Sequence, residues 1–139
     1  GIAEQKKLLL QFPYPAELSA PVWHIALDLD YLYFLLDRYP KVCFGSSGKY
    51  WNVGSIKWAE RIDYIFNQLA KKFRYLPYIH MLRGMSLGGS KYPFASTDSV
   101  NVARNFKDQK KCPESMARKI DAMQTPLFWK SMPTQSNLL

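Results

Sequence analysis

Four short apolar runs recur along the chain. They cover residues 22–27, 41–47, 76–84 and 93–97, and each has the length of a β-strand. The runs are continuously apolar rather than alternating, a pattern typical of parallel strands that helices bury on both faces. We therefore expect an α/β fold in which parallel strands are joined by crossover helices.

Helical spacing fills the stretches between the first three runs. Asp28 can cap one helix, which Pro40 ends, and Ser55 can cap a longer one. Apolar residues at steps of three or four mark the face that each helix would bury. They are Leu29, Leu32, Leu35 and Leu36 in the first helix, and Ile56, Ala59, Ile62, Ile65, Phe66, Leu69 and Phe73 in the second.

Three more helices are predicted outside these units. One covers Ala3–Phe12, one runs from about Ser99 to Asn105, and Pro113 opens a last one. Residues 130–139 are expected to form a loosely ordered tail. Together, residues 1–139 are predicted to form a single domain or a domain fragment.

Four strand–helix units amount to half of a closed eight-stranded barrel. A half-barrel alone would leave the two edges of its sheet bare, which proteins rarely tolerate. We therefore expect either that an N-terminal half is missing from this chain or that two copies form a homodimer and cover each other.

Composition and charge narrow the range of partners. Hydrophobic residues make up 47%, enough for a core, and no apolar run approaches the roughly 20 residues that cross a bilayer. The N-terminus lacks a signal-peptide pattern, so we expect no membrane association. The net charge of +8 arises within residues 71–119, which hold eleven basic groups against three acidic ones. Such a field favours a polyanion, nucleic acid first, slightly over the alternative of a solvated basic face.

The cysteines and histidines predict little metal or redox chemistry. Cys43 lies in an apolar run and is interpreted as a small core residue, whereas Cys112 lies in a basic loop. Neither has metal-ligand spacing, and the two histidines, His24 and His80, form no cluster with them. His80 is interpreted as a satisfied core histidine. We expect no metal, no cofactor and a reducing, cytoplasmic setting.

Functional residues of α/β proteins gather where strands end and helices begin. The second run ends in Gly45, Ser46 and Ser47, whose backbone amides can approach a ligand closely but equally suit an ordinary tight turn. Arg83 directly follows the third strand and is either a ligand contact or a surface arginine.

The turn after the fourth run is unusually rich in small polar groups. One such residue suffices to cap a helix, and capping alone explains Asp98. An aspartate at a strand end, beside an arginine and amide side chains, can also act as a nucleophile or general base. The candidate substrate contacts around it are Ser96, Ser99, Asn101, Arg104 and Asn105.

These motifs carry a resemblance. The stretches "VWHIALDLDYLYFLLDRYPKVCFGSSGKYWNVGS" and "LPYIHMLRGMSLGGSKYPFASTDSVNVARN" closely resemble a group of phage and prophage proteins, over nearly all of residues 20–125. The shared mark is "PFAS-DS-N-ARN", here Pro93–Ser96, Asp98, Ser99, Asn101 and Ala103–Asn105. In that group, further strand–helix units precede this segment, as the missing-half expectation requires.

The group in turn is distantly similar to the queuine tRNA-ribosyltransferase (tRNA-guanine transglycosylase) TIM barrels. The resemblance puts Gly45 and Ser46 at the family's base-binding turn and "IHMLRGM" on its seventh strand. The nucleophilic aspartate at the eighth strand of the family matches Asp98. The chain departs from the family in three ways: it lacks the Pro-Thr-Arg run and the C-terminal Cys/His zinc site, and Arg83 interrupts the glycine pair.

Two functions follow from these residues and the resemblance. The first is a transglycosylase- or glycosidase-like enzyme that acts on a nucleobase–sugar bond in nucleic acid or a nucleoside. Asp98 would be its nucleophile, and Arg83 and Arg104 would contact phosphate or the base edge. The second is a non-catalytic phage-encoded module that binds nucleic acid or protein, with Asp98 only a cap. The enzyme requires Asp98, Gly45 and Arg83 to converge in one pocket.

Overall fold

The computed structural model describes residues 1–87, 90–98 and 126–130. In chain order its elements, with η for a 3-10 helix, are α1 (Ile2–Leu10), η1 (Ala16–Leu18), β1 (Val22–His24), α2 (Leu29–Arg38), β2 (Lys41–Gly45), η2 (Gly48–Tyr50), α3 (Ile56–Lys72), β3 (Tyr78–Met81), η3 (Met85–Leu87) and β4 (Ser96–Thr97).

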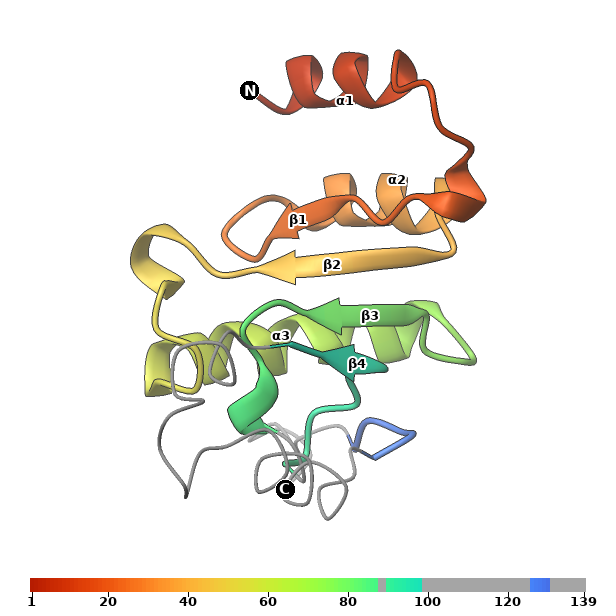
Figure 1. Cartoon of the computed structure of the whole chain (residues 1–139). Coiled ribbons are helices and arrows are strands. Elements are labelled where there is room, and N and C mark those ends of the chain that lie inside the picture. The colour runs from red at the N-terminus through yellow and green to blue at the C-terminus, as the bar shows by residue number, and fades with distance from the viewer. Residues whose placement is uncertain (88–89, 99–125, 131–139) are drawn as a thin grey trace, which may run out of the picture.

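The four strands form one sheet in which every neighbouring pair is parallel. Their spatial order, β1-β2-β3-β4, is also their order along the chain. Helices α2 and α3 are the crossovers between the first three strands, and a loop containing η3 leads to β4 (Figure 1). The predicted α/β fold with parallel strands is thus confirmed. A run of adjacent strands that follow one another in sequence is also what part of a βα-barrel contains.

The predicted elements are confirmed with shorter strands. β1 ends at His24, because the Leu27 amide donates to the His24 carbonyl at 2.9 Å and closes a turn. The predicted cap of α3 is present, with the Trp58 amide donating to Ser55 Oγ at 3.3 Å. The helices predicted from Ser99 and from Pro113 lie outside the described residues, as does the tail beyond Lys130.

Burial alternates along the strands, which differs from the expectation that both faces are buried. In β2, Val42 and Phe44 are buried while Cys43 between them is half-buried; in β3, Ile79 is buried and Tyr78 exposed. Right-handed crossovers that advance in one direction place their helices on one side of a sheet, as Figure 1 shows for α2 and α3. We call the other side the open face; its side chains are those of Val22, His24, Lys41, Cys43, Tyr78, His80 and Ser96, with Gly45 among them.

Aromatic residues dominate the buried face. The Phe44 ring on β2 lies 5.1 Å from that of Trp23 on β1 and 6.4 Å from that of Phe66 on α3. The Phe66 ring in turn lies 5.3 Å from that of Phe94, which is 1% exposed and lies two residues before β4. Burying each ring of this size stabilises the folded state by roughly 1.5–3 kcal/mol. Phe94 therefore anchors the segment that delivers Ser96 and Asp98.

Among the residues that the structure describes, no helix is long and apolar enough to span a bilayer.

Candidate functional site at the ends of β3 and β4

Asp98 follows β4 and is fixed to the turn after β3. Its backbone amide donates to the Met81 carbonyl at 3.4 Å, and its carbonyl accepts from the Met85 amide at 3.2 Å. Its side chain accepts from the Arg83 amide, with 2.7 Å between Arg83 N and Asp98 Oδ1. The second carboxylate oxygen, Oδ2, is not used in these bonds, and the side chain is 55% exposed. One oxygen therefore holds the carboxylate in place, while the side chain as a whole stays more than half exposed.

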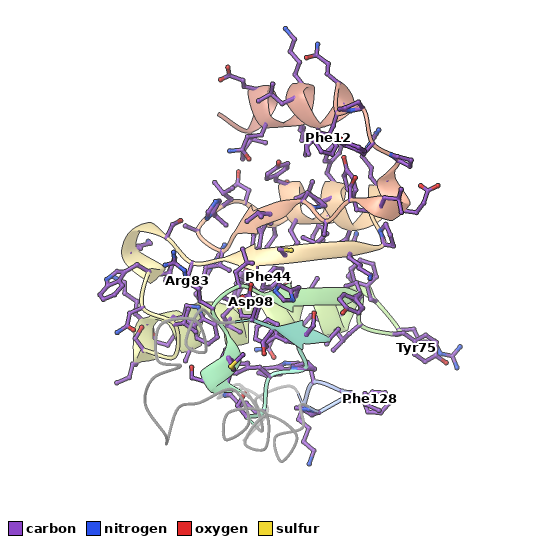
Figure 2. All side chains as sticks on the ribbon, viewed as in Figure 1. Phe12, Phe44, Tyr75, Arg83, Asp98 and Phe128 are labelled. Carbon is purple, nitrogen blue, oxygen red and sulfur yellow. The ribbon has the colours of Figure 1, made fainter. Side chains whose placement is uncertain are left out.

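The turn that receives Asp98 has special backbone geometry. Arg83 adopts a left-handed conformation with φ 59°, which costs a non-glycine residue about 1 kcal/mol. The next residue is Gly84, and the turn leaves no room for a side chain there: a Cβ would lie 2.5 Å from Met81 Cγ. Arg83 was predicted as a substrate contact, and it does join Asp98, but through its backbone amide. Its side chain is exposed, and Figure 2 shows Arg83 and Asp98 close together near the ends of the strands.

A chain of polar side chains on the open face leads to Asp98. Tyr78 OH donates to Ser96 Oγ at 3.0 Å, and Ser96 Oγ lies 2.6 Å from His80 Nδ1. On the other side of the ring, His80 Nε2 is 3.6 Å from Asp98 Oδ2. His80 is thus satisfied by a partner, as predicted, but it lies half-buried on the open face and not in the core. Ser96, a predicted contact, belongs to this chain.

Cys43 is the neighbour of His80 across the sheet, because the two are paired in register. It is half-buried on the open face, whereas the sequence suggested a core position. Burial raises the pKa of the Cys43 thiol above its ordinary value, and the negative charge of Asp98 raises it further. The thiol is therefore kept neutral, which disfavours it as a nucleophile beside Asp98.

Gly45 and the two serines after it form a second group at the same end of the sheet. A Cβ on Gly45 would lie 3.0 Å from His24 Nδ1, so the absence of a side chain leaves room for that ring. Ser47 Oγ is 3.2 Å from the same nitrogen, and Ser46 Oγ accepts from Trp58 Nε1 at 3.0 Å. The Ser46 side chain thus braces the loop against α3, which leaves its backbone as the group available to a ligand.

The predicted site residues are brought together in part. Asp98, Ser96 and the backbone of Arg83 meet, and Gly45 lies two strands away from Asp98 at the same carboxyl end. Four predicted contacts lie outside the described residues, and nothing tests them: Ser99, Asn101, Arg104 and Asn105.

Much of the predicted basic segment also lies outside the described ranges. Within them, Lys91 bonds to Asp63 at 3.0 Å, and Lys72 lies 4.5 Å from the centre of the Tyr33 ring. Those two charges serve contacts within the protein. The prediction that residues 71–119 attract a polyanion stays a prediction.

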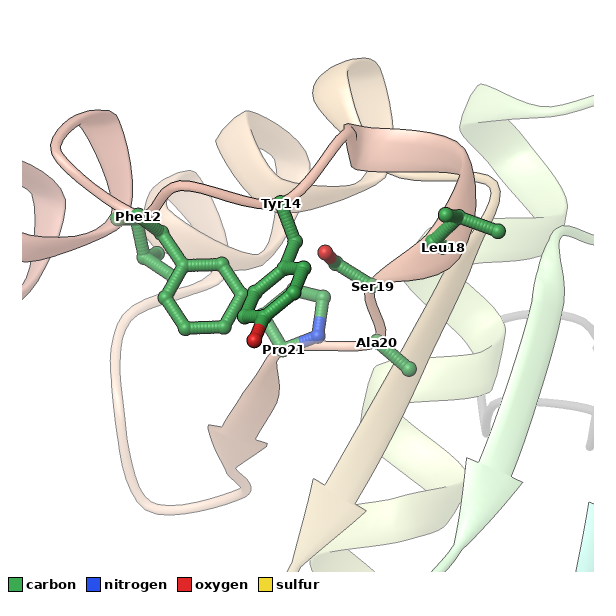
Figure 3. Close-up of a pocket in the computed structure, with 7 residues that line it drawn as sticks. Phe12, Tyr14, Leu18, Ser19, Ala20 and Pro21 are labelled. Atoms are coloured by element: carbon green, nitrogen blue, oxygen red, sulfur yellow. The ribbon is translucent and has the colours of Figure 1, made fainter.

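Three hollows in the described structure lie away from Asp98. An apolar one of about 440 Å³ adjoins the segment before β1 (Figure 3), and its lining residues are Leu9, Phe12, Tyr14, Leu18, Ser19, Ala20 and Pro21. A polar one of about 390 Å³ involves Asp28, Asp30 and Arg61, and one of about 330 Å³ lies beside the start of β3. Asp98, Gly45 and Arg83 line none of these three. The convergence of Asp98, Gly45 and Arg83 in one pocket, which the enzyme requires, is therefore not found in these three hollows.

The chain was compared with protein-family models, curated proteins and solved structures. No protein-family model, curated protein or solved structure matches this chain. In the part of the chain that the structure describes, no group of three or more His, Cys, Asp or Glu side chains could hold a metal ion.

Sequence reasoning missed His80, Tyr78 and His24 as parts of the site. A signal was present in the third run, where Ile79 and Met81 are apolar. Strict alternation places Tyr78 and His80 on the opposite face from that pair. The runs are so apolar that their composition favours burial on both faces and hides this alternation.

Proposed function

We propose that this chain is a transglycosylase- or glycosidase-like enzyme, or the catalytic part of one, with Asp98 as its nucleophile. The observation that carries the proposal is how the carboxylate is held. A simple helix cap accepts amides of its own helix, whereas Asp98 Oδ1 accepts the amide of Arg83, from the turn after a different strand. Oδ2 takes no part in that bond, and the Asp98 side chain is 55% exposed at the carboxyl end of a parallel sheet, where α/β enzymes place their reacting groups.

The reaction divides into two displacements. Asp98 Oδ2 attacks the anomeric carbon of a nucleoside unit, so a C–O bond forms as the C–N bond to the base breaks. The electron pair of that bond leaves with the base, which takes up a proton from water. In the second step, a nitrogen of an incoming base, or the oxygen of water, forms a new bond to the same carbon. The incoming group loses a proton, and the carboxylate is regenerated.

We propose a binding role for each of the predicted contact residues in this reaction. We infer that the nucleobase lies near the Gly45 turn, where a missing side chain allows close approach. Arg83 and Arg104 contact phosphate or the base edge, Ser47, Ser99, Asn101 and Asn105 supply hydrogen bonds, and the basic segment holds a nucleic-acid backbone. Cytoplasmic nucleic acid or a nucleoside is the substrate class we propose.

The open face needs a cover before it can form an enclosed pocket. Only one edge of β1 is paired with a strand among the described residues, and the segment beside it exposes the large side chains of Phe12, Tyr14 and Leu18. We propose that further strands close the sheet towards a TIM barrel, supplied by a second copy or by an N-terminal half. Light scattering separates these sources: a dimer supports the first, and a monomer that needs added upstream sequence for activity supports the second.

Replacing Asp98 tests the proposed function. Asp98→Asn keeps an Oδ1 that accepts the Arg83 amide, so the turn is preserved while the nucleophile is lost. We expect base release or base exchange on tRNA, DNA oligonucleotides and nucleosides, followed by mass spectrometry, to fall at least about 10³-fold, since the covalent route is closed. Asp37→Asn is the matched control, because it removes an exposed carboxylate on α2, and it should keep full activity.

Binding to the same oligonucleotides separates the enzyme from a binding module. The enzyme predicts that Asp98→Asn retains wild-type affinity by fluorescence anisotropy while losing turnover. Wild-type protein that binds nucleic acid with no base release, and is unaffected by either substitution, would favour the non-catalytic module instead.

A further inference from the structure

We infer that His80 is a positioning residue for Asp98, itself oriented by Ser96 and Tyr78; this inference rests on the proposed function. The geometry points to it because each side of the imidazole ring has a defined partner. Nδ1 lies 2.6 Å from Ser96 Oγ, and Nε2 faces Asp98 Oδ2 at 3.6 Å.

The partners of the Ser96 hydroxyl point to the position of the ring proton, which the distances alone do not fix. Tyr78 OH donates to Ser96 Oγ at 3.0 Å, which leaves the Ser96 hydroxyl hydrogen free to point at His80 Nδ1. Nδ1 is then the acceptor, so a neutral ring carries its proton on Nε2, the atom that faces the carboxylate. The chain from Tyr78 through Ser96 and His80 therefore aims an N–H group at Asp98.

The distance between His80 Nε2 and Asp98 Oδ2 indicates that His80 positions the nucleophile and is not the acid that protonates the leaving base. At 3.6 Å, Nε2 and Oδ2 are too far apart for a direct hydrogen bond and close enough to tighten into one when substrate binds. A group that protonates the departing base needs more space: in retaining glycosidases the two carboxyl groups stand roughly 5 Å apart, with the sugar between them. His80 is therefore placed to hold and orient the nucleophile.

Burial supports a fixed ring. The His80 side chain is 21% exposed, against 55% for Asp98, and its backbone is paired to Cys43 on one side and Ser96 on the other. A ring held by strands on both sides keeps its orientation better than one on a loop. The more fixed part of the site is thus the His80 ring, and the more exposed part is the Asp98 side chain.

Two conservative variants test this role through opposite ends of the ring. The amide of Gln in His80→Gln can reach the Nε2 position and donate to Asp98, whereas Asn in His80→Asn reaches only the Nδ1 position beside Ser96. Positioning predicts that kcat falls about 10- to 100-fold in His80→Asn and less than about 10-fold in His80→Gln, with KM nearly unchanged in both. Equal losses in the two variants, at equal thermal stability, would overturn the inference.

An NMR measurement that needs no substrate tests the hydrogen-bond chain separately. The histidines are labelled with the nitrogen-15 isotope, and the His24→Gln variant assigns the two imidazole signals. We expect His80 to show a protonated Nε2 and an acceptor Nδ1. Ser96→Ala should shift the ring toward a mixture of the two tautomers. A ring protonated on Nδ1 in the wild type would overturn the chain even if the enzyme is active. The expected tautomer with no base release at all would instead count against the proposed function alone.

Discussion

The two faces of the sheet have different roles: one packs into the core, and the other carries the polar side chains of the candidate site. On the buried face, Phe44 and Met81 belong to the core, and the Phe44 ring contacts that of Phe66 on α3. On the open face, His80, the residue before Met81, lies beside Ser96 of the neighbouring strand. Because the side chains of a strand alternate, the same backbone serves both faces. Packing on the buried face therefore fixes the strand ends, and those ends then position the Asp98 carboxylate.

The largest expected effect comes from breaking the buried face. Phe44→Ala removes a fully buried ring that contacts the rings of Trp23, Phe66 and Phe94, and should lower the free energy of unfolding by about 3–5 kcal/mol. Cys43→Ala, the adjacent residue on the open face, should cost less than about 1 kcal/mol. Urea unfolding followed by circular dichroism measures both, and similar losses would contradict a division of duties between the faces.

High pH should destabilise the buried side of the molecule through Tyr92. Burial, chiefly, and the charge and hydrogen bond of Asp63 raise the pKa of Tyr92 from 10.0 to about 12. The folded protein holds this proton more tightly than the unfolded chain, so the stabilisation is complete below pH 10 and declines as pH rises toward 12.

The slope attributable to one such group is at most about 1.4 kcal/mol per pH unit. Tyr92→Phe should flatten the fall in unfolding free energy across that window, measured by urea titration at each pH. An identical pH dependence in wild type and variant would show that Tyr92 does not carry it.

The smallest expected effect separates the backbone of Arg83 from its side chain. Arg83→Gly relieves the left-handed backbone at φ 59° but adds freedom to the unfolded chain, so stability should change by less than about 1 kcal/mol. The amide that donates to Asp98 Oδ1 remains. If the side chain contacts nucleic acid, affinity for oligonucleotides falls and its salt dependence weakens, while kcat persists. A loss of kcat with unchanged affinity would instead assign Arg83 to the reaction step.

Periodicity and capping predicted most of the fold because they are local. Ser55 and the apolar residues that recur after it at steps of three or four predict α3, and the four apolar runs predict the four strands. The strand ends were less predictable, since β1 stops early at a turn closed between His24 and Leu27.

The sequence predicts only those site residues that lie at the end of a strand. Asp98 and Ser96 were found in that way, but the pairing of His80 with Ser96 depends on register between strands separated by a loop. Likewise, nothing local indicates that Arg83 adopts a left-handed backbone and turns its amide toward Asp98. These contacts are set by tertiary packing, which a single sequence does not display.

Covalent trapping is the most direct test of the claim that the open face performs glycosyl transfer through Asp98. Protein would be mixed with oligonucleotide or tRNA, denatured rapidly, and its peptides analysed by mass spectrometry. The account predicts a nucleic-acid adduct on the peptide that contains Asp98, present in wild type and Asp37→Asn and absent from Asp98→Asn. An adduct that persists in Asp98→Asn, or base release with an adduct on a different residue, would contradict it.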